Sequence, residues 1–139
     1  MSRNLILVIV LAVIGFAVWL YYKGKNAGLT FIPDVAYPHG TEAIPSNYNP
    51  NPLADELHEV MKGLFTSPAT KEKAFQKLYN LPTDDLLVLV YNTFNKKYGR
   101  EGSGSLTKWI DDEVIHTYGF FTSSIKSKLL ARLRSINLK

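Results

Sequence analysis

Apolar residues fill one unbroken stretch near the start of the chain. From Leu5 to Tyr22, eighteen consecutive residues carry no charge, and a helix of that length rises about 27 Å, close to the thickness of a bilayer's hydrocarbon core. A cleaved signal peptide has a shorter apolar stretch followed by small residues. This stretch instead runs into aromatic and basic residues typical of a membrane interface: Trp19, Tyr21, Tyr22, Lys23 and Lys25. The pattern predicts a single-pass transmembrane anchor over residues 1–23.

The alternative reading of this stretch is a buried core helix, but such helices rarely lack a polar face altogether. Charge gives little information on orientation. Arg3 and the amino terminus lie before the stretch and Lys23 and Lys25 lie after it, so the positive-inside bias only slightly favours a cytoplasmic C-terminal domain. The predicted location is a membrane, either cellular or internal to a virion.

Proline and asparagine replace the apolar pattern between residues 24 and 52. Five of the chain's seven prolines fall here, and no periodic apolar face is present. In an extended, polyproline-like form at roughly 3.1 Å per residue, the segment could reach on the order of 80 Å. It also carries more apolar side chains than a spacer needs, notably Phe31, Ile32, Tyr37 and Tyr48. Both an extended linker and an arm that docks on its own domain or on a neighbour remain open.

The remainder, residues 53–139, has the 3.6-residue periodicity of helices and predicts an all-α domain of five helices. Gly63 and Gly99 are expected to end the first and third helices, while Ser67 and Thr83 are expected to cap the second and third. Asp84 and Asp85 complement the N-terminus of the third helix. The residues expected on buried faces include Leu53, Leu57, Val60, Met61, Leu64, Phe75, Leu78, Leu86, Leu89, Val90, Phe94, Leu106, Trp109, Ile110, Val114, Ile125, Leu129, Leu133 and Ile136.

This order of five helices, with Met-Lys-Gly-Leu-Phe-Thr at residues 61–66 between the first two, resembles a single annexin repeat. The family's first inter-helix loop has the signature Met-Lys-Gly-X-Gly-Thr, which Met61, Lys62, Gly63 and Thr66 match. Phe65 stands where the second glycine belongs. The resemblance implies calcium bound by loop carbonyls and a downstream acid. Matching by helix pattern selects Glu113 for that acid, whereas counting from the last helix reaches Phe120. This ambiguity and the departure at Phe65 both argue against the site. Annexins stack four repeats, so a lone repeat is expected to cover apolar surface by assembly.

The last helix is basic, and the whole chain has a net charge of +4 with no cysteine. Lys128, Arg132 and Lys139 cluster on one side of this helix, which suits lipid phosphates. An equally good explanation is that these cations complement the helix dipole and keep the chain soluble. Nucleic acid is not expected as a partner, because the helix lacks interleaved aromatic residues for base stacking.

Catalytic and metal-binding patterns are weak. His39, His58 and His116 are scattered, and no HExxH motif or recognisable nucleophile context is present. The acidic run Asp111, Asp112 and Glu113 points in different directions on a helix and fits a solvated face better than a site. We therefore expect no cofactor, no metal, no small-molecule substrate and no enzymatic activity.

Two classes of function are consistent with these patterns. The favoured one is a membrane-anchored structural or interaction protein that presents a small helical module at a membrane surface, with protein partners or a homo-oligomer. A small virion protein that joins an internal membrane to a capsid is one concrete form. The alternative is a membrane-tethered enzyme or accessory subunit whose chemistry the sequence does not reveal.

Overall fold

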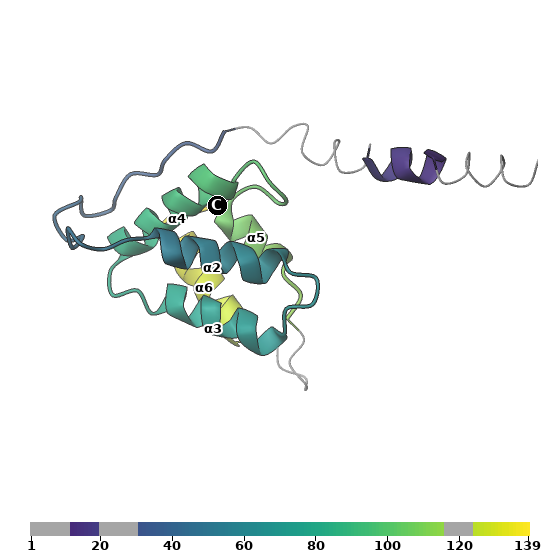
Figure 1. Cartoon of the computed structure of the whole chain (residues 1–139). Helices are drawn as coiled ribbons and strands as arrows, with labels where there is room; N and C mark the ends of the chain where they lie inside the picture. The colour runs from purple at the N-terminus through teal and green to yellow at the C-terminus, as the bar shows by residue number, and fades with distance from the viewer. Residues whose placement is uncertain (1–11, 20–30, 116–123) are drawn as a thin grey trace, which may run out of the picture. The chain divides into compact units, whose positions relative to one another are not determined.

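The computed structural model describes residues 12–19, 31–115 and 124–139, and the chain divides into two compact units, Met1–Thr30 and Phe31–Lys139. Helices are the only regular secondary structure in the described residues, and no strand occurs among them (Figure 1). The prediction of an all-α fold is therefore confirmed for these parts of the chain.

In the N-terminal unit, residues 12–19 form a helix whose side chains are all exposed, including Val13, Ile14, Phe16 and Val18. The rings of Phe16 and Trp19 stack with their centroids 5.6 Å apart. Over the described ranges, no helix has both the length and the apolarity needed to cross a bilayer. Most of the predicted span lies outside the described residues, so the transmembrane anchor stays a prediction.

The second unit contains α2 (Asn51–Lys62), α3 (Pro68–Tyr79), α4 (Asp84–Tyr98), α5 (Leu106–Asp112) and α6 (Ser124–Ser135). Helix α2 packs against α3 and α4, α3 packs against α6, and α5 packs against α4 and α6. Figure 1 shows this bundle, with α6 visible between α2 and α3. The described part of the arm, residues 31–50, runs along the outside of α4 before the chain enters α2.

Local signals in the sequence set the helix ends. The Ser67 hydroxyl accepts a hydrogen bond from the Thr70 amide at 3.2 Å, and the Thr83 hydroxyl accepts one from the Leu86 amide at 3.2 Å. Each bond satisfies an amide that the first helical turn leaves without a backbone partner. Gly63 and Gly99 follow the last residues of α2 and α4. The predicted caps and stops of these helices are confirmed.

One continuous apolar core joins all five helices. The buried hydrophobic residues that form it are Ala54, Leu57, Val60, Met61, Ala74, Phe75, Leu78, Leu87, Val88, Val90, Tyr91, Phe94, Leu106, Ile110, Ile125, Leu129, Leu130, Leu133 and Leu138. Helix α4 is covered on more sides than expected, because Leu87, Val88 and Tyr91 are buried as well as the predicted Leu86 and Val90. Leu89, which was also expected in the core, is only half-buried.

Two predicted core residues lie outside the core because their helices end earlier than expected. Helix α2 stops at Lys62, which leaves Leu64 in the following loop with 93% of its surface exposed. Helix α5 stops at Asp112, and the Lys126 ammonium group donates to the carbonyls of Asp111 and Glu113 at that end. The chain is extended at Glu113, so Val114 points to solvent.

The C-terminus folds back into the core through a tight turn after α6. Asn137 adopts the left-handed conformation with φ of 61°, the Asn137 amide donates to the Arg134 carbonyl, and the Leu138 amide donates to the Leu133 carbonyl. This pair of bonds is a Schellman motif, in which the residue after the turn commonly makes an apolar contact. Leu138 is accordingly fully buried.

Candidate functional site

The arm lies antiparallel along α4. Ile32 contacts Gly99 at the C-terminal end of the helix, Val35 bonds to Asn92 two turns earlier, and the amide of His39 bonds to Asp85 two turns earlier again. Seven helical residues rise about 10 Å, which three or four extended residues also span, so the two segments stay in register. The arm is therefore a strap on α4 rather than a free spacer.

Two buried polar side chains of α4 hold this strap. The Asn92 side chain accepts a bond from the Val35 amide and donates one to the Val35 carbonyl, each 2.9 Å long. Asp85 accepts a bond from the His39 amide, also 2.9 Å long. Asn92 is 7% exposed and Asp85 is 1% exposed. Because a buried polar group without a partner is costly, these residues make the arm part of the folded domain.

Close packing reinforces the strap at its start. A Cβ atom at Gly99 would come within 2.4 Å of the Asn95 carbonyl oxygen and 3.0 Å of the Ile32 side chain. Only glycine fits at this position without displacing its neighbours. Farther along, the partly buried side chains of Val35, Tyr37 and Tyr48 pack against the core.

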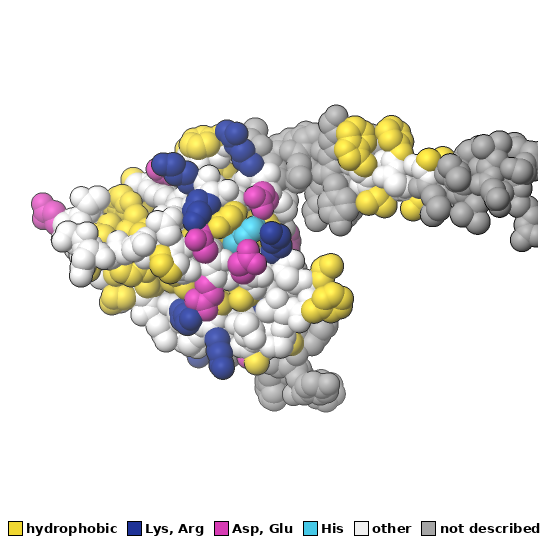
Figure 2. Space-filling view, viewed as in Figure 1, with side chains coloured by type: hydrophobic (Ala, Val, Ile, Leu, Met, Phe, Trp, Pro, Cys, Tyr) yellow, Lys and Arg dark blue, Asp and Glu magenta, His cyan; other side chains and the backbone are white. Residues whose placement is uncertain are grey.

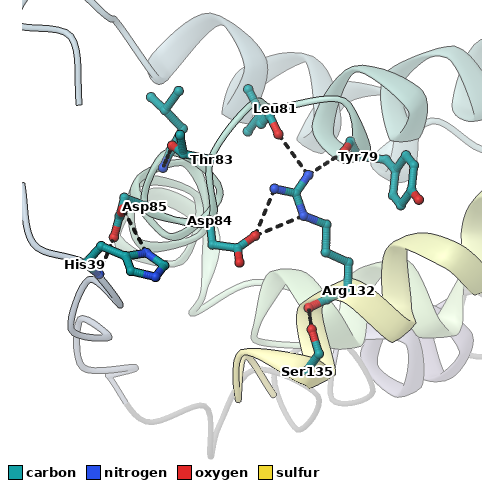
Figure 3. Close-up of polar contacts among 9 residues, drawn as sticks. His39, Tyr79, Leu81, Thr83, Asp84, Asp85, Arg132 and Ser135 are labelled. Carbon is teal, nitrogen blue, oxygen red and sulfur yellow. Dashed lines mark hydrogen bonds and ion pairs between the residues drawn. The ribbon is translucent and has the colours of Figure 1, made fainter. Parts of the chain in front are cut away.

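The N-terminal end of α4 carries a cluster of charged side chains around Arg132 (Figure 3). The guanidinium group of Arg132 donates from Nε and Nη2 to one Asp84 oxygen, at 3.1 and 2.9 Å. Its Nη1 donates to the carbonyls of Tyr79 and Leu81, at the end of α3 and in the loop after it. Arg132 thus ties α6 to the end of α3 and the start of α4, and a guanidinium fork suits this task better than an ammonium group.

A shallow depression of about 400 Å³ lies beside this cluster. Its lining residues are His39, Ala43, Pro82, Thr83, Asp84, Asp85 and Arg132. The charged groups there are already engaged with one another: Asp84 with Arg132 as above, and the Asp85 carboxylate with the His39 ring at 3.4 Å. The charged groups that line the depression therefore join the arm and α6 to α4.

A second polar cluster surrounds His58, where α2 meets α4 and α5. The His58 Nε2 atom lies 2.9 Å from a Glu101 oxygen, and its ring stacks on Tyr98 with a centroid distance of 3.7 Å and an interplanar angle of 3°. Trp109 packs edge-on against the same ring. The His58 side chain is only 5% exposed. A histidine so covered can position a helix, but it presents little surface to a substrate.

Asp55 links this cluster to the end of α4. It forms an ion pair with Lys97 and accepts a 2.7 Å bond from the Tyr98 hydroxyl. The bond from Lys97, with that from Tyr98, lowers the pKa of Asp55 below its ordinary value, and the same bonds to Asp55 raise the pKa of Lys97 and of Tyr98. The three groups together fasten the start of α2 to the end of α4.

Three of the four arm residues predicted to contact a partner pack instead against their own domain. Tyr37 and Tyr48 pack against their own domain, and Ile32 packs on Gly99, whereas Phe31 is exposed. Of the three cations predicted to contact lipid, Arg132 is bonded to Asp84 and to the carbonyls of Tyr79 and Leu81. Lys128 and Lys139 are exposed.

The predicted membrane-interface residues Tyr21, Tyr22, Lys23 and Lys25 lie outside the described residues. Trp19 lies at the end of the helical stretch 12–19, is exposed and stacks on Phe16. The prediction from sequence omitted Asn92 and gave Asp85 only a role at the N-terminus of its helix. A signal for them was present, because Asp85 and Asn92 are seven positions apart in α4 and so share one face of the helix, where buried polar groups need partners.

The loop that resembles the annexin signature is short and apolar at its tip. Leu64 and Phe65 are 93% and 99% exposed, while Met61 is buried in the core. Glu113, the acid that the resemblance would assign to calcium, forms an ion pair with Lys71. Within the described ranges, no group of three His, Asp or Glu side chains could hold a metal ion.

Comparisons with known proteins give no family assignment. No family model matches the chain, and neither the search of curated proteins nor that of solved structures finds a significant match. The resemblance of residues 53–139 to an annexin repeat therefore stays a prediction, and the function has to be argued from the residues themselves.

Proposed function

We propose that this protein is a single-pass membrane-anchored interaction protein, which holds a compact helical module close to a membrane surface. The observation that carries the proposal is the uncharged run from Leu5 to Tyr22 with aromatic and basic residues at its end. The exposed apolar side chains of residues 12–19 support it, because a helix of this kind needs an apolar environment.

The buried polar groups of the module have structural roles, which supports an interaction protein over an enzyme. Its buried polar groups Asn92 and Asp85 bind the arm, and Arg132 joins three segments. The alternative, a membrane-tethered enzyme, would draw on His58 and Glu101. His58 is buried under Tyr98 and Trp109, so its ring is closed to a substrate, which favours the interaction protein.

Protein partners would meet the module at the α2–α3 loop. Leu64 and Phe65 extend there into solvent, and aromatic side chains dominate the energies of many protein interfaces. The arm, which the sequence offered as a contact surface, is used within the domain. A virion protein that joins an internal membrane to a capsid is one concrete form of such a protein.

Extraction of membranes with alkaline carbonate tests the proposal. Full-length protein should stay in the membrane fraction, and protein that lacks residues 1–22 should be soluble. Release of the full-length protein by carbonate alone would contradict the proposal.

A further inference from the structure

The loop between α2 and α3 is a closed turn with apolar residues at its tip. The Thr66 amide donates to the Gly63 carbonyl at 3.3 Å, so Leu64 and Phe65 are the central residues of a β-turn. These positions usually carry glycine, proline, asparagine, aspartate or serine. Here both apolar side chains are almost fully exposed, and Figure 2 shows a hydrophobic group protruding from the module where this loop runs. The turn holds the tip in place, which lowers the entropy cost of docking.

A recess of about 390 Å³ lies just after this tip along the chain, between α3 and the start of α6. Its lining residues are Ala69, Glu72, Lys73, Gln76 and Ile125. The four residues from α3 recur at spacings of three and four, so they share one face of the helix. An extended chain spans at most about 3.6 Å per residue, which places Ala69 within about 14 Å of Phe65. One patch of the module therefore carries both a protruding apolar tip and a recess.

We propose that a second copy of this chain covers this patch, with the tip of each copy seated in the recess of the other. The inference rests on the proposed function as an interaction protein, and it names the partner that meets the α2–α3 loop. A two-fold dimer needs a surface that complements itself, and a projection beside a recess meets that need. Because the two features lie in one patch, both contacts form at once about a two-fold axis.

The charges beside the tip and the recess are suited to pairing between copies. Lys62, the last residue of α2, is exposed beside the tip, and Glu72 lines the recess. Within residues 12–19, 31–115 and 124–139, neither side chain makes a hydrogen bond or an ion pair. In the dimer, Lys62 of each copy lies opposite Glu72 of the other. Lys73 in the recess and the exposed Glu59, one turn before Lys62, are a second pair of opposite sign.

The apolar area at this end of the module fits a weak interface. A buried phenylalanine covers about 150–250 Å², so two tips that bury Phe65 and Leu64 exclude water from several hundred Å². Val114 adds an exposed apolar side chain at the same end, because the ion pair of Glu113 with Lys71 joins the end of α5 to α3. Specific interfaces bury about 1,200–2,000 Å² in total, so the α3 faces supply the remainder. A shared membrane would raise the local concentration of the copies.

Sedimentation equilibrium of the full-length protein in density-matched detergent tests the dimer. The parent protein should dimerise reversibly. The double variant Leu64→Ser/Phe65→Ser should raise the dissociation constant by at least about thirtyfold, which is the effect of losing an interface hot spot. The matched control is Phe31→Ser, which removes an exposed apolar ring from the arm and should leave the dissociation constant unchanged. Circular dichroism of each variant verifies that its helical content equals that of the parent.

Exchange of the charges tests which residues face each other. Lys62→Glu places two acids opposite each other at both ends of the patch, so the dissociation constant should rise by about tenfold. The double variant Lys62→Glu/Glu72→Lys restores opposite signs and should dimerise like the parent. Rescue of this kind is not expected if the tip associates non-specifically.

A single cysteine tests the symmetry, because the chain has none of its own. Ala69 lies between the tip and the centre of the recess along the chain, so residue 69 of both copies should lie near the axis. A short bismaleimide should therefore join Ala69→Cys copies into dimers and nothing larger. Thr41→Cys, at an exposed position in the arm, should give no cross-linked species above background.

Several results would overturn the inference. A parent protein that stays monomeric would show that the tip meets lipid or an unlike protein instead. A dimer that persists in Leu64→Ser/Phe65→Ser, a charge exchange without rescue, or a ladder of cross-linked species would each rule out the two-fold contact described. Carbonate extraction measures the anchor independently of these experiments, so a failure of the dimer is distinguishable from a failure of the proposed membrane attachment.

Discussion

Asn92 in α4 and Val35 in the arm are joined by two hydrogen bonds, each 2.9 Å long, one in each direction. A side-chain amide here bonds to a backbone amide and carbonyl as a neighbouring strand would. With the bond from the His39 amide to Asp85, it fixes the arm to the most buried helix of the domain. The contact decides where the folded module begins.

Substitution of Asn92 by alanine tests the strap. The change leaves the Val35 amide and carbonyl without their partner and opens a gap in a buried position, so we expect unfolding in urea to become easier by about 2–3 kcal/mol. Amide hydrogen exchange at Val35 should also become faster. Asn80→Ala, which removes an exposed bond to Gln76, should change stability by less than about 0.5 kcal/mol. Equal unfolding midpoints for parent and Asn92→Ala would show that the arm is held by other contacts.

Substitution of Arg132 by lysine separates a structural role from a lipid-binding one. The charge is kept, but an ammonium group cannot span Asp84 and the carbonyls of Tyr79 and Leu81 together, so stability should fall by about 1–3 kcal/mol. Arg134→Lys is the matched control, because its 3.4 Å contact with Asp111 is exposed. If Arg132→Lys unfolds like the parent protein, the bonds of Arg132 do not hold α6 to the end of α3 and the start of α4.

The decrease in the free energy of unfolding at acid pH should depend on Asp55. Its pKa is lowered in the folded protein by the bond from Lys97, followed by that from Tyr98. A lowered pKa means that the stabilising contribution is complete above the ordinary value of 3.8 and is lost as the pH falls through the folded value. Asp55→Asn should therefore flatten the decrease in stability below about pH 4. A carboxyl titration by NMR that places Asp55 at or above its ordinary pKa would contradict the described bonds.

Calcium should not drive membrane binding by this chain. Phe65 replaces the glycine that would let the loop turn its carbonyls inward, and Glu113 is already paired with Lys71. Titration calorimetry of the full-length protein in detergent should show no calcium site with a dissociation constant between about 1 μM and 1 mM. A site in that range would restore the annexin-like reading of the loop.

The fold was predictable to the extent that local signals determine it. Ser67, Thr83 and the two terminal glycines define helix ends through bonds within a few residues, and the apolar periodicity identified most of the core. Leu64 and Val114 were misplaced because periodicity continues past a helix end that is set by other contacts. For α5 these are the bonds from Lys126 to the carbonyls at its C-terminus.

The contacts of the arm were less predictable, since they depend on pairs far apart in the chain. The arm's apolar residues suggested docking, but the surface on which they dock is marked by Asn92 and Asp85, 57 and 46 residues away from their partners. The bonds of Arg132 were not predicted for the same reason. On a basic helix it resembles its neighbours, and only its position opposite Asp84 and the end of α3 shows what it binds.

The most direct test of the membrane-anchored reading is carbonate extraction of native membranes, followed by flotation, with full-length protein compared with protein lacking residues 1–22. The full-length chain should float with the lipid after extraction, and the truncated chain should remain soluble and helical, because the strap and the bundle both begin after residue 30. Recovery of the full-length chain in the soluble fraction would contradict the anchor, and with it the placement of the helical module at a membrane.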